Sequence, residues 1–320
     1  MSSPFVTIGI TAFNADDTIL RAVLSALAQD WPHFEVLVYD DASVDDTPRL
    51  LKEIEAQNPN VRVVYGTENK GVAYARNRLI EMALGEFLAF FDDDDVSVPD
   101  RVLRQYERIL AYERDFAHGA PVICHSARTQ YYPDGVERYE ATMGMDDSGL
   151  APHGEAVALR VLTGKGGKAF FGSLATCSQM GRVSLYRGLG GFDEGFRRGE
   201  DTDFSVRLAL AGGHFAGVAA PLVRQTMTMG AEKNLDEELA LHLKLMQKHR
   251  DFITVHASYG FCRDWLVNKY RFLAGQRGAF LCNMAILLCR HPVETLRRLF
   301  RALPNTGFNL RFRRFHDGRQ

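Results

Sequence analysis

The sequence predicts an α/β protein with a mainly parallel sheet flanked by helices, followed by a helical C-terminal extension. Short apolar, β-branched segments alternate with segments of helical periodicity through the first hundred residues. Such alternation requires right-handed crossovers between parallel strands. With 46% hydrophobic and 24% charged residues among 320, the chain has the composition of a globular protein large enough for one large domain and an appendage, or for two small domains.

Four strands, with helices between them, are expected in the first hundred residues. The strand segments are rich in Val, Ile, Leu and Phe, as buried strands are, and they cover residues 6–10, 34–39, 61–65 and 87–91. The spacing of the apolar residues predicts helices over about 19–27, from Pro48 onward and over 73–84.

The second half of the main domain has a more mixed pattern. A strand is expected over 121–124 and a helix over 201–211. The Gly- and Lys-rich stretch 164–168 lacks the spacing of a phosphate-binding loop, and we interpret it as a mobile loop. The main domain is expected to cover residues 1–225, and the helical extension residues 226–320.

Polar residues follow three of the predicted strands. Residues 11–14 follow the first strand, Asp40 and Asp41 follow the second, and residues 92–95 follow the fourth. In a parallel α/β sheet, ligands bind beyond the carboxyl ends of the strands. The sequence therefore predicts a binding site at this edge, although Asp40 and Asp41 alone are also typical of caps and turns.

Residues 92–95 are four consecutive aspartates at the end of an apolar strand. Adjacent carboxylates repel one another, so the run requires a compensating cation, and oxygen ligands suit Mg²⁺ or Mn²⁺. The alternative is an acidic turn in which one aspartate caps a helix that starts near Pro99. The position of the run at the expected ligand edge favours the metal site.

A second carboxylate cluster lies at residues 199–203, directly before an apolar helical segment. A carboxylate at the mouth of a site can act as a general base on a hydroxyl nucleophile. Asp201 can equally be the N-cap of the helix that follows. Sequence spacing alone leaves both interpretations open.

Together these features resemble the ordered motifs of family 2 inverting glycosyltransferases with the GT-A fold. The motifs are Thr11-Ala-Phe-Asn14, Asp40-Asp-Ala-Ser-Val-Asp-Asp-Thr47, Asn69-Lys-Gly-Val-Ala-Tyr-Ala-Arg-Asn77, Phe91-Asp-Asp-Asp-Asp95 and Gly199-Glu-Asp201. The resemblance covers about residues 4–225, and its ordered motifs are a specific signal although each is common alone. It implies a GT-A-type, Rossmann-like domain with a donor half over residues 1–100 and an acceptor half over 101–225.

The resemblance also implies roles for residues in the donor half. Thr11, Phe13 and Asn14 are expected to line the nucleotide pocket, with Phe13 near the base. Asp41 is expected to accept a hydrogen bond from a uracil imide. Arg76 is expected to approach the diphosphate.

Further roles are implied for the two acidic motifs. Asp92 and Asp94 match the DxD pattern and are the expected ligands of Mn²⁺ or Mg²⁺, with Asp94 ranked first as the direct ligand. Asp92 is also expected to contact the nucleotide-sugar. Asp93 stands where many relatives have a small or neutral residue, and it is expected to face the donor ribose or sugar. Asp201 matches the general base, and Glu200 beside it is expected to contact the acceptor.

The implied reaction transfers a hexosyl or N-acetylhexosaminyl group from a UDP-sugar, or another nucleotide-sugar, to an acceptor hydroxyl by in-line displacement with inversion. A glycan or lipid-linked acceptor is expected, in polysaccharide, lipopolysaccharide or glycolipid assembly. A nucleotidyltransferase is one alternative, but such enzymes carry a Gly-rich basic loop in place of residues 11–14. A non-catalytic nucleotide- or glycan-binding subunit is another, and the presence of both Asp94 and Asp201 argues against it.

The C-terminal extension is basic, with twelve Lys and Arg against three Asp and Glu from Ala257 onward. From Trp265 to Arg301, apolar and basic residues are mixed, which is typical of a segment that lies on an anionic membrane surface. A helical lid or an oligomer contact is the alternative. No nucleic-acid partner is expected, because no known nucleic-acid motif is present.

The expected location is the cytoplasm, with attachment to the inner face of the cytoplasmic membrane through the basic extension. Five cysteines without a CxxC pair indicate neither a disulfide framework nor a zinc ribbon. The first residues do not resemble a secretory signal. The apolar stretch 279–289 is shorter than the roughly 20 residues that span a bilayer.

Overall fold

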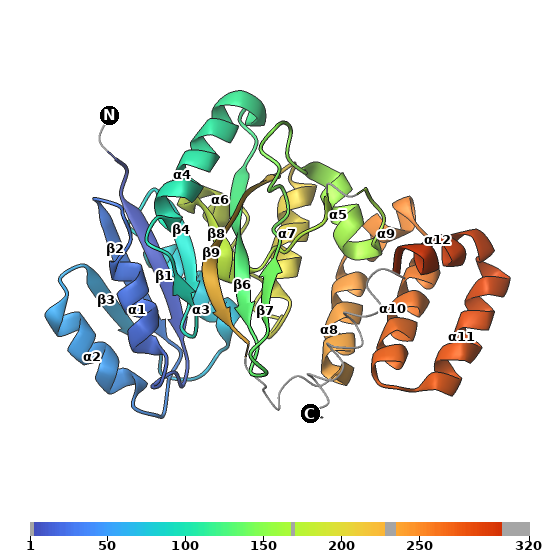
Figure 1. Ribbon diagram of the computed structural model, residues 1–320, viewed down its shortest axis with the longest axis horizontal. Helices are drawn as coiled ribbons and strands as arrows, with labels where there is room; N and C mark the ends of the chain where they lie inside the picture. The colour runs from blue at the N-terminus through green and yellow to red at the C-terminus, as the bar shows by residue number, and fades with distance from the viewer. Residues whose placement is uncertain (1–2, 168–169, 228–234, 303–320) are drawn as a thin grey trace. The chain divides into compact units, whose positions relative to one another are not determined.

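A computed structural model describes residues 3–167, 170–227 and 235–302 of the chain (Figure 1). Its first four long strands are parallel and lie in the order β3-β2-β1-β4. Their bounds are β1 Val6–Ala12, β2 Phe34–Asp40, β3 Val61–Tyr65 and β4 Phe87–Asp92. The crossovers run through helices α1 Ile19–Leu27, α2 Thr47–Gln57 and α3 Val72–Met82. The strands and helices expected in the first hundred residues are therefore confirmed.

Beyond β4 the sheet becomes mixed. The order continues β4-β8-β6-β9-β5, with β7 paired to β6, and among these pairs only β6 and β9 run parallel in the described residues. The bounds are β5 Val96–Ser97, β6 Val122–Tyr131, β7 Glu137–Glu140, β8 Gln179–Arg182 and β9 His214–Thr226. The expectation of a mainly parallel sheet thus describes the first half well, whereas the second half adds antiparallel pairs because β8 enters from a long connection and runs back against β4.

The remaining helical segments of this unit are α4 Arg101–Tyr112, η1 Glu113–Ala117, α5 Gly154–Thr163, η3 Thr176–Ser178, α6 Val183–Gly188 and α7 Glu200–Leu210. The η3 turn leads directly into β8, next to the end of β4. Helix α7 begins one residue before the expected position, at Glu200. These two segments bring residues from the second half of the chain to the edge where β4 ends.

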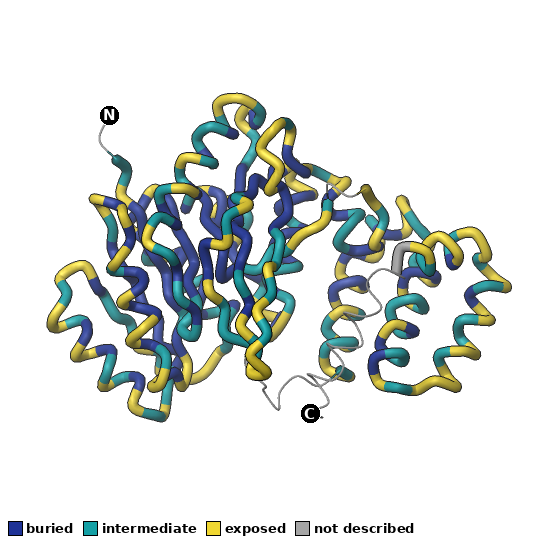
Figure 2. The backbone as a smooth tube through the Cα atoms, viewed as in Figure 1, coloured by how far each residue is buried: buried dark blue, intermediate teal, exposed yellow. Residues whose placement is uncertain are grey.

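The central strands are buried along most of their length (Figure 2), and side chains pack on both faces of them. On one face, Ile8 and Ile10 of β1 pack in a cluster with Ile19 of α1 and Val102 of α4, all fully buried. On the other face, a Cβ at Gly9 would lie 3.2 Å from a methyl group of Leu79, so glycine allows α3 to approach the sheet closely. Burial of each large aliphatic side chain stabilises this arrangement by about 1.5–3 kcal/mol.

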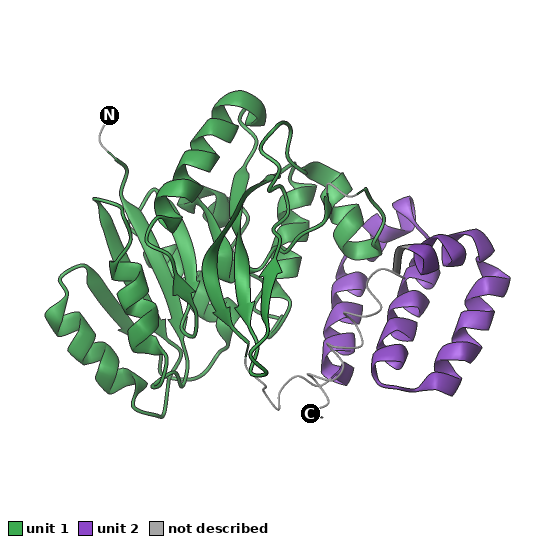
Figure 3. Ribbon diagram, viewed as in Figure 1, with its two compact units in different colours: residues 1–227 green, residues 228–320 purple. Residues whose placement is uncertain are grey.

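The chain divides into two compact units, Met1–Met227 and Thr228–Gln320 (Figure 3). The second unit is helical over its described residues, as expected for the C-terminal extension. Its helices are α8 Leu235–Lys248, α9 Arg250–His256, α10 Tyr259–Leu273, α11 Arg277–Arg290 and α12 Pro292–Ala302. The basic residues beyond 302, and the side chain of Arg301, lie outside the described residues.

Packing within the second unit depends on mixed polar and aromatic contacts. Tyr270 donates to a carboxylate oxygen of Glu238 at 3.3 Å and connects α10 to α8. The guanidinium of Arg298 lies 5.0 Å from the ring centre of Phe261 and 5.5 Å from that of Trp265, which connects α12 to α10. Within the residues described, none of the helices combines the length and apolar content needed to cross a membrane.

Candidate functional site

Strand register aligns the polar residues that follow β1, β2 and β4. Thr11 lies between Tyr39 of β2 and Asp92 of β4, and Ala12 is opposite Asp40. The carboxyl ends of these parallel strands therefore meet at one edge of the sheet. The expected ligand edge brings together Thr11, the aspartates after β2 and the aspartates after β4.

The loop after β1 is held by contacts with the other two strand ends. The backbone N–H of Phe13 donates to Asp93 Oδ2 at 3.1 Å, and that of Asn14 donates to Ser43 Oγ at 2.8 Å. Asn14 Oδ1 in turn accepts from the N–H of Val44 at 2.9 Å, and the Asn14 backbone is left-handed, with φ 49°. The Phe13 side chain stays 44% exposed, so its ring is free to stack on a ligand.

Asp41 is buried and braces the start of α3. Its Oδ1 accepts from the N–H of Lys70 at 3.1 Å, and its Oδ2 accepts from the N–H of Gly71 at 2.7 Å. Gly71 is the N-cap of α3 with φ 90°, a conformation that favours glycine. Each carboxylate oxygen has a second lone pair, so recognition of a base by Asp41 stays a prediction that is compatible with this bracing role.

Arg76 of α3 connects the two acidic motifs. Its Nη1 donates to Glu200, and its Nη2 lies 3.3 Å from Asp92 Oδ1. Burial lowers the pKa of Arg76, but the nearby carboxylates of Glu200, Asp92 and Asp201 raise it by more. The guanidinium therefore stays charged and joins α3 both to the start of α7, 124 residues away in sequence, and to the end of β4.

The aspartates after β4 lie in different surroundings. Burial, reinforced by the neighbouring carboxylates, raises the pKa of Asp93 to about 7 and that of Asp95 to about 8. Asp95 Oδ1 accepts from the N–H of Thr226 at 3.1 Å. The N-cap of α4 is Asp100, so the alternative in which one of residues 92–95 caps that helix is wrong.

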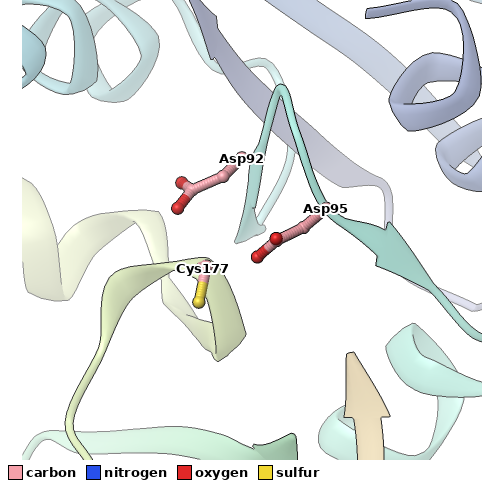
Figure 4. A group of neighbouring side chains, drawn as sticks. All are labelled: Asp92, Asp95 and Cys177. Atoms are coloured by element: carbon pink, nitrogen blue, oxygen red, sulfur yellow. The ribbon is translucent and has the colours of Figure 1, made fainter. Parts of the chain in front are cut away.

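The residues present fit a divalent cation. Asp92, Asp95 and Cys177 each offer a ligand atom, and these atoms all lie within 4.8 Å of one another. Figure 4 shows the three side chains converging from the end of β4, from the turn that follows it and from η3. Asp92, one of the two predicted metal ligands, belongs to this group; ligation by Asp94 stays a prediction.

The second acidic motif opens α7. Gly199 is the N-cap, with φ 76°, so Asp201 lies inside the first turn and the interpretation of Asp201 as the N-cap is wrong. Asp201 Oδ1 accepts from the N–H of Thr202 at 2.6 Å and from its hydroxyl at 3.1 Å. Burial raises the pKa of Glu200, while Arg76 lowers it. The half-buried Asp201 is thus the more accessible carboxylate of the pair.

A buried polar network supports the acidic turn from behind. Arg101 is fully buried; its Nη2 donates to the carbonyl oxygen of Phe90 at 2.7 Å, and its Nη1 donates to Ser97 Oγ at 2.8 Å. Its guanidinium lies 4.2 Å from the ring centre of Phe91, and burial lowers its pKa to about 10. Arg101 therefore fixes both ends of the segment that carries the four aspartates.

Sequence reasoning did not assign roles to Arg101, Arg128 or Cys177. Arg101 follows the acidic run closely and is the first residue of α4. Its position next to the aspartates in sequence is a signal that could have indicated a supporting role. Cys177 and Arg128 lie far from the acidic run in sequence, and only the pairing of β8 and β6 with the sheet brings them near it. Lys168, at the end of the expected mobile loop, lies outside the described residues.

Comparisons with known proteins agree with this geometry. Residues 7–159 match the family model for glycosyl transferase family 2. A putative teichuronic acid biosynthesis glycosyltransferase, TuaG, of Bacillus subtilis is 39% identical over 107 residues, which are 33% of this chain and 42% of that protein. The succinoglycan biosynthesis protein ExoO of Rhizobium meliloti is 45% identical over 105 residues, 33% of this chain and 30% of that protein. The matched segments thus span less than half the length of these relatives.

Two solved structures share the fold. Residues 1–349 of TarS from S. aureus, in complex with UDP-GlcNAc, align with a TM-score of 0.58 at 18% identity, over 83% of this chain and 72% of that chain. The mannosyltransferase PcManGT from Pyrobaculum calidifontis, in complex with GDP-Man and Mn²⁺, aligns with a TM-score of 0.58 at 15% identity, over 99% and 85%. These alignments show that the chain has the GT-A fold, and its residues 7–159 match glycosyl transferase family 2.

Proposed function

We propose that this chain is a metal-dependent inverting glycosyltransferase that moves a sugar from a UDP-sugar to an acceptor hydroxyl during assembly of a cell-surface glycan. The contact of Arg76 with both Asp92 and Glu200 carries the proposal. It joins the predicted donor motif and the predicted acceptor motif in one site. The relatives named for teichuronic acid and succinoglycan biosynthesis support the substrate class.

The donor side of the proposed site begins with the exposed ring of Phe13, which stacks on the nucleotide base. Thr11 and Asn14 line the pocket beside it, and Asp41 accepts from the base through a free lone pair. Arg76 provides positive charge where the diphosphate of the donor binds, while Asp93 faces the ribose or sugar. A divalent cation bound at the aspartates would neutralise charge on the departing nucleoside diphosphate.

The acceptor side provides the base. Asp201 takes the proton of the acceptor hydroxyl as its oxygen forms a bond to the anomeric carbon, and Glu200 helps to orient the acceptor. The bond to the diphosphate oxygen breaks in the same step, and UDP leaves with the electron pair. The local hydrogen bonds of Asp201 to Thr202 fix the carboxylate orientation, which positions the base for in-line attack.

The first test is release of UDP from a panel of UDP-sugars, with and without Mn²⁺. We expect turnover of one donor with metal only, and its loss in Asp94→Ala and Asp201→Asn proteins that remain folded. Glu107→Gln, an exposed position on α4, is the matched control. Pyrophosphate release would favour a nucleotidyltransferase. UDP binding without turnover on any supplied acceptor would favour a non-catalytic subunit.

We further propose that the second unit attaches the enzyme to an anionic membrane surface, where lipid-linked acceptors lie. Helices α11 and α12 expose large apolar side chains next to arginines: Leu281, Ile286, Val293, Leu296, Phe300, Arg277, Arg290 and Arg297. Exposed apolar groups beside cations suit the interface of an anionic bilayer. Attachment would be supported if the protein co-sediments with anionic vesicles but not with zwitterionic ones, and if Leu296→Ser with Phe300→Ser weakens this binding. A protein that binds neither type of vesicle would favour the lid or the oligomer contact.

A further inference from the structure

We propose that Asp92, Asp95 and Cys177 form a mixed oxygen and sulfur site for a divalent cation, and that the sulfur makes this site prefer Mn²⁺, Co²⁺ or Cd²⁺ to Mg²⁺. The inference rests on the proposed function for its role in turnover, because the ion would lie at the donor edge. Its ligand set differs from a DxD site that uses carboxylates alone. The binding of the ion itself is testable without any sugar donor.

The spacing of the three side chains suits one ion. Metal bonds to carboxylate oxygen and to thiolate sulfur are about 2.0–2.3 Å long, so ligands on opposite sides of an ion stand about 4–4.6 Å apart. The ligand atoms here all lie within 4.8 Å of one another. A contraction of a few tenths of an ångström is therefore enough, and Figure 4 shows the three side chains close together.

Asp95 supplies an independent indication of a missing ligand. Its side chain is 5% exposed, and its Oδ2 has no hydrogen-bond partner among the described residues. An unsatisfied buried polar atom destabilises the folded protein, and more so when it is charged. Asp41, buried in the same unit, has both oxygens satisfied by backbone N–H groups. The contrast indicates that Asp95 Oδ2 is reserved for a cation.

The sulfur of Cys177 is positioned by side chains that donate hydrogen bonds to it. Cys177 is 2% exposed; Arg128 Nη1 donates to its Sγ at 3.1 Å, and Gln225 Nε2 donates at 3.7 Å. Arg128 is itself anchored to Ser173 Oγ at 2.7 Å. When a metal–sulfur bond forms and the thiol proton leaves to solvent, the guanidinium offsets the charge of the thiolate. Cys124, also buried, instead directs its thiol to a backbone carbonyl of His125 at 3.8 Å.

Ligand chemistry then predicts selectivity. Mg²⁺ requires oxygen ligands in near-ideal octahedral geometry and gives up water reluctantly. Thiolate ligands favour softer ions, and affinity rises from Mn²⁺ through Co²⁺ across the first-row series. A serine at position 177 would replace the sulfur with a hard oxygen. The substitution should therefore weaken Co²⁺ and Cd²⁺ binding while leaving Mg²⁺ binding unchanged or stronger.

The test uses full-length protein in which the exposed thiols are removed by Cys282→Ser and Cys289→Ser, without nucleotide. Titration with Cd²⁺ or Co²⁺ should produce sulfur-to-metal charge-transfer absorption at one equivalent. Cys177→Ser in this background should abolish the band, and Asp95→Asn should weaken binding by a factor of roughly ten to a hundred. Cys124→Ala is the matched control and should keep the band. Circular dichroism and thermal unfolding confirm that each variant is folded.

The outcomes separate this proposal from the proposed function. No band in the parent protein, or a band that survives Cys177→Ser, would overturn the mixed-ligand site. A band that depends on Cys177 but comes with no turnover of any UDP-sugar would support the site and count against the glycosyltransferase. Metal-dependent turnover without the band would place the ion on the other aspartates and overturn the proposal.

Discussion

Replacing Arg76 with methionine removes the buried cation that Glu200 and Asp92 share. The guanidinium donates to Glu200 and lies 3.3 Å from Asp92, and both Arg76 and Glu200 are almost fully buried. Removal of one partner from a buried ion pair typically costs about 3–5 kcal/mol, because the other charge remains without compensation. We expect Arg76→Met to lower the free energy of unfolding of the first unit by that amount at pH 7.5 in EDTA.

The expected loss depends on pH in a defined direction. Arg76 lowers the pKa of Glu200 and burial raises it, so in Arg76→Met the folded-state pKa of Glu200 rises further above that of the unfolded chain. A carboxyl whose folded-state pKa is raised costs stability once the pH exceeds the unfolded pKa, about 4.3. The difference between wild type and Arg76→Met should therefore be small near pH 4.5 and reach its full size above neutral pH.

The assay is urea unfolding of wild type, Arg76→Met, Glu200→Gln and the double variant. Glu200→Gln removes the charge that Arg76→Met leaves unpaired, so the double variant should lose clearly less than the sum of the two single variants. The coupling energy of such a cycle isolates the pair. A loss under about 1 kcal/mol for Arg76→Met, or strictly additive losses, would refute the reasoning that one guanidinium holds the two acidic motifs together.

Three further predictions concern single positions. Asp95→Asn should stabilise the metal-free protein relative to wild type, because the raised folded-state pKa of Asp95 makes its ionisation costly. The gain in unfolding free energy should grow from pH 4 to about pH 8. A constant difference in unfolding free energy across this range would contradict the prediction. Phe13→Ala should weaken UDP binding by about 1–3 kcal/mol, the usual value of a base stacked on an aromatic ring, and leave the melting temperature almost unchanged, as calorimetry can measure. Gly144→Ala should prevent stable folding, because Gly144 has φ +71° and a Cβ there would lie 1.8 Å from the carbonyl oxygen of Phe215. Gly135→Ala, at φ +76° with open space around it, should cost only about 1–2 kcal/mol, and similar melting temperatures for the two would count against the clash.

Local sequence patterns were enough to predict the strands and helices of the first hundred residues. Each of its strands is a short apolar run, and each intervening helix has its own periodicity, so neighbours in sequence decide the element. The polar ends of β1, β2 and β4 then had to meet, because parallel strands share one carboxyl edge. The position of Thr11 between Tyr39 and Asp92 follows from that register.

Residues 101–225 could be predicted less completely, because their strands are paired through long-range contacts. β8 lies antiparallel between β4 and β6, and no local pattern indicates that a four-residue strand after η3 will enter the sheet there. The same pairing carries Cys177 to the end of β4. The aspartates can therefore be found from the sequence, whereas Cys177 cannot, since only the tertiary structure places its sulfur near the aspartates.

The side chains of this site fall into two groups that are supported differently, and we expect that difference to matter for function. The carboxylates of Asp92 and Glu200 are held by one arginine from α3, so their positions respond together to anything that moves that guanidinium. Asp95 and Cys177 are held separately, by the N–H of Thr226 and by Arg128, both on the β6–β9 side of the sheet. A diphosphate that drew Arg76 away from Asp92 would free that carboxylate for a cation without disturbing the other two ligands. We therefore expect donor binding and completion of the proposed metal site to be coupled through Arg76, so that the cation binds more tightly in the presence of the nucleotide than alone.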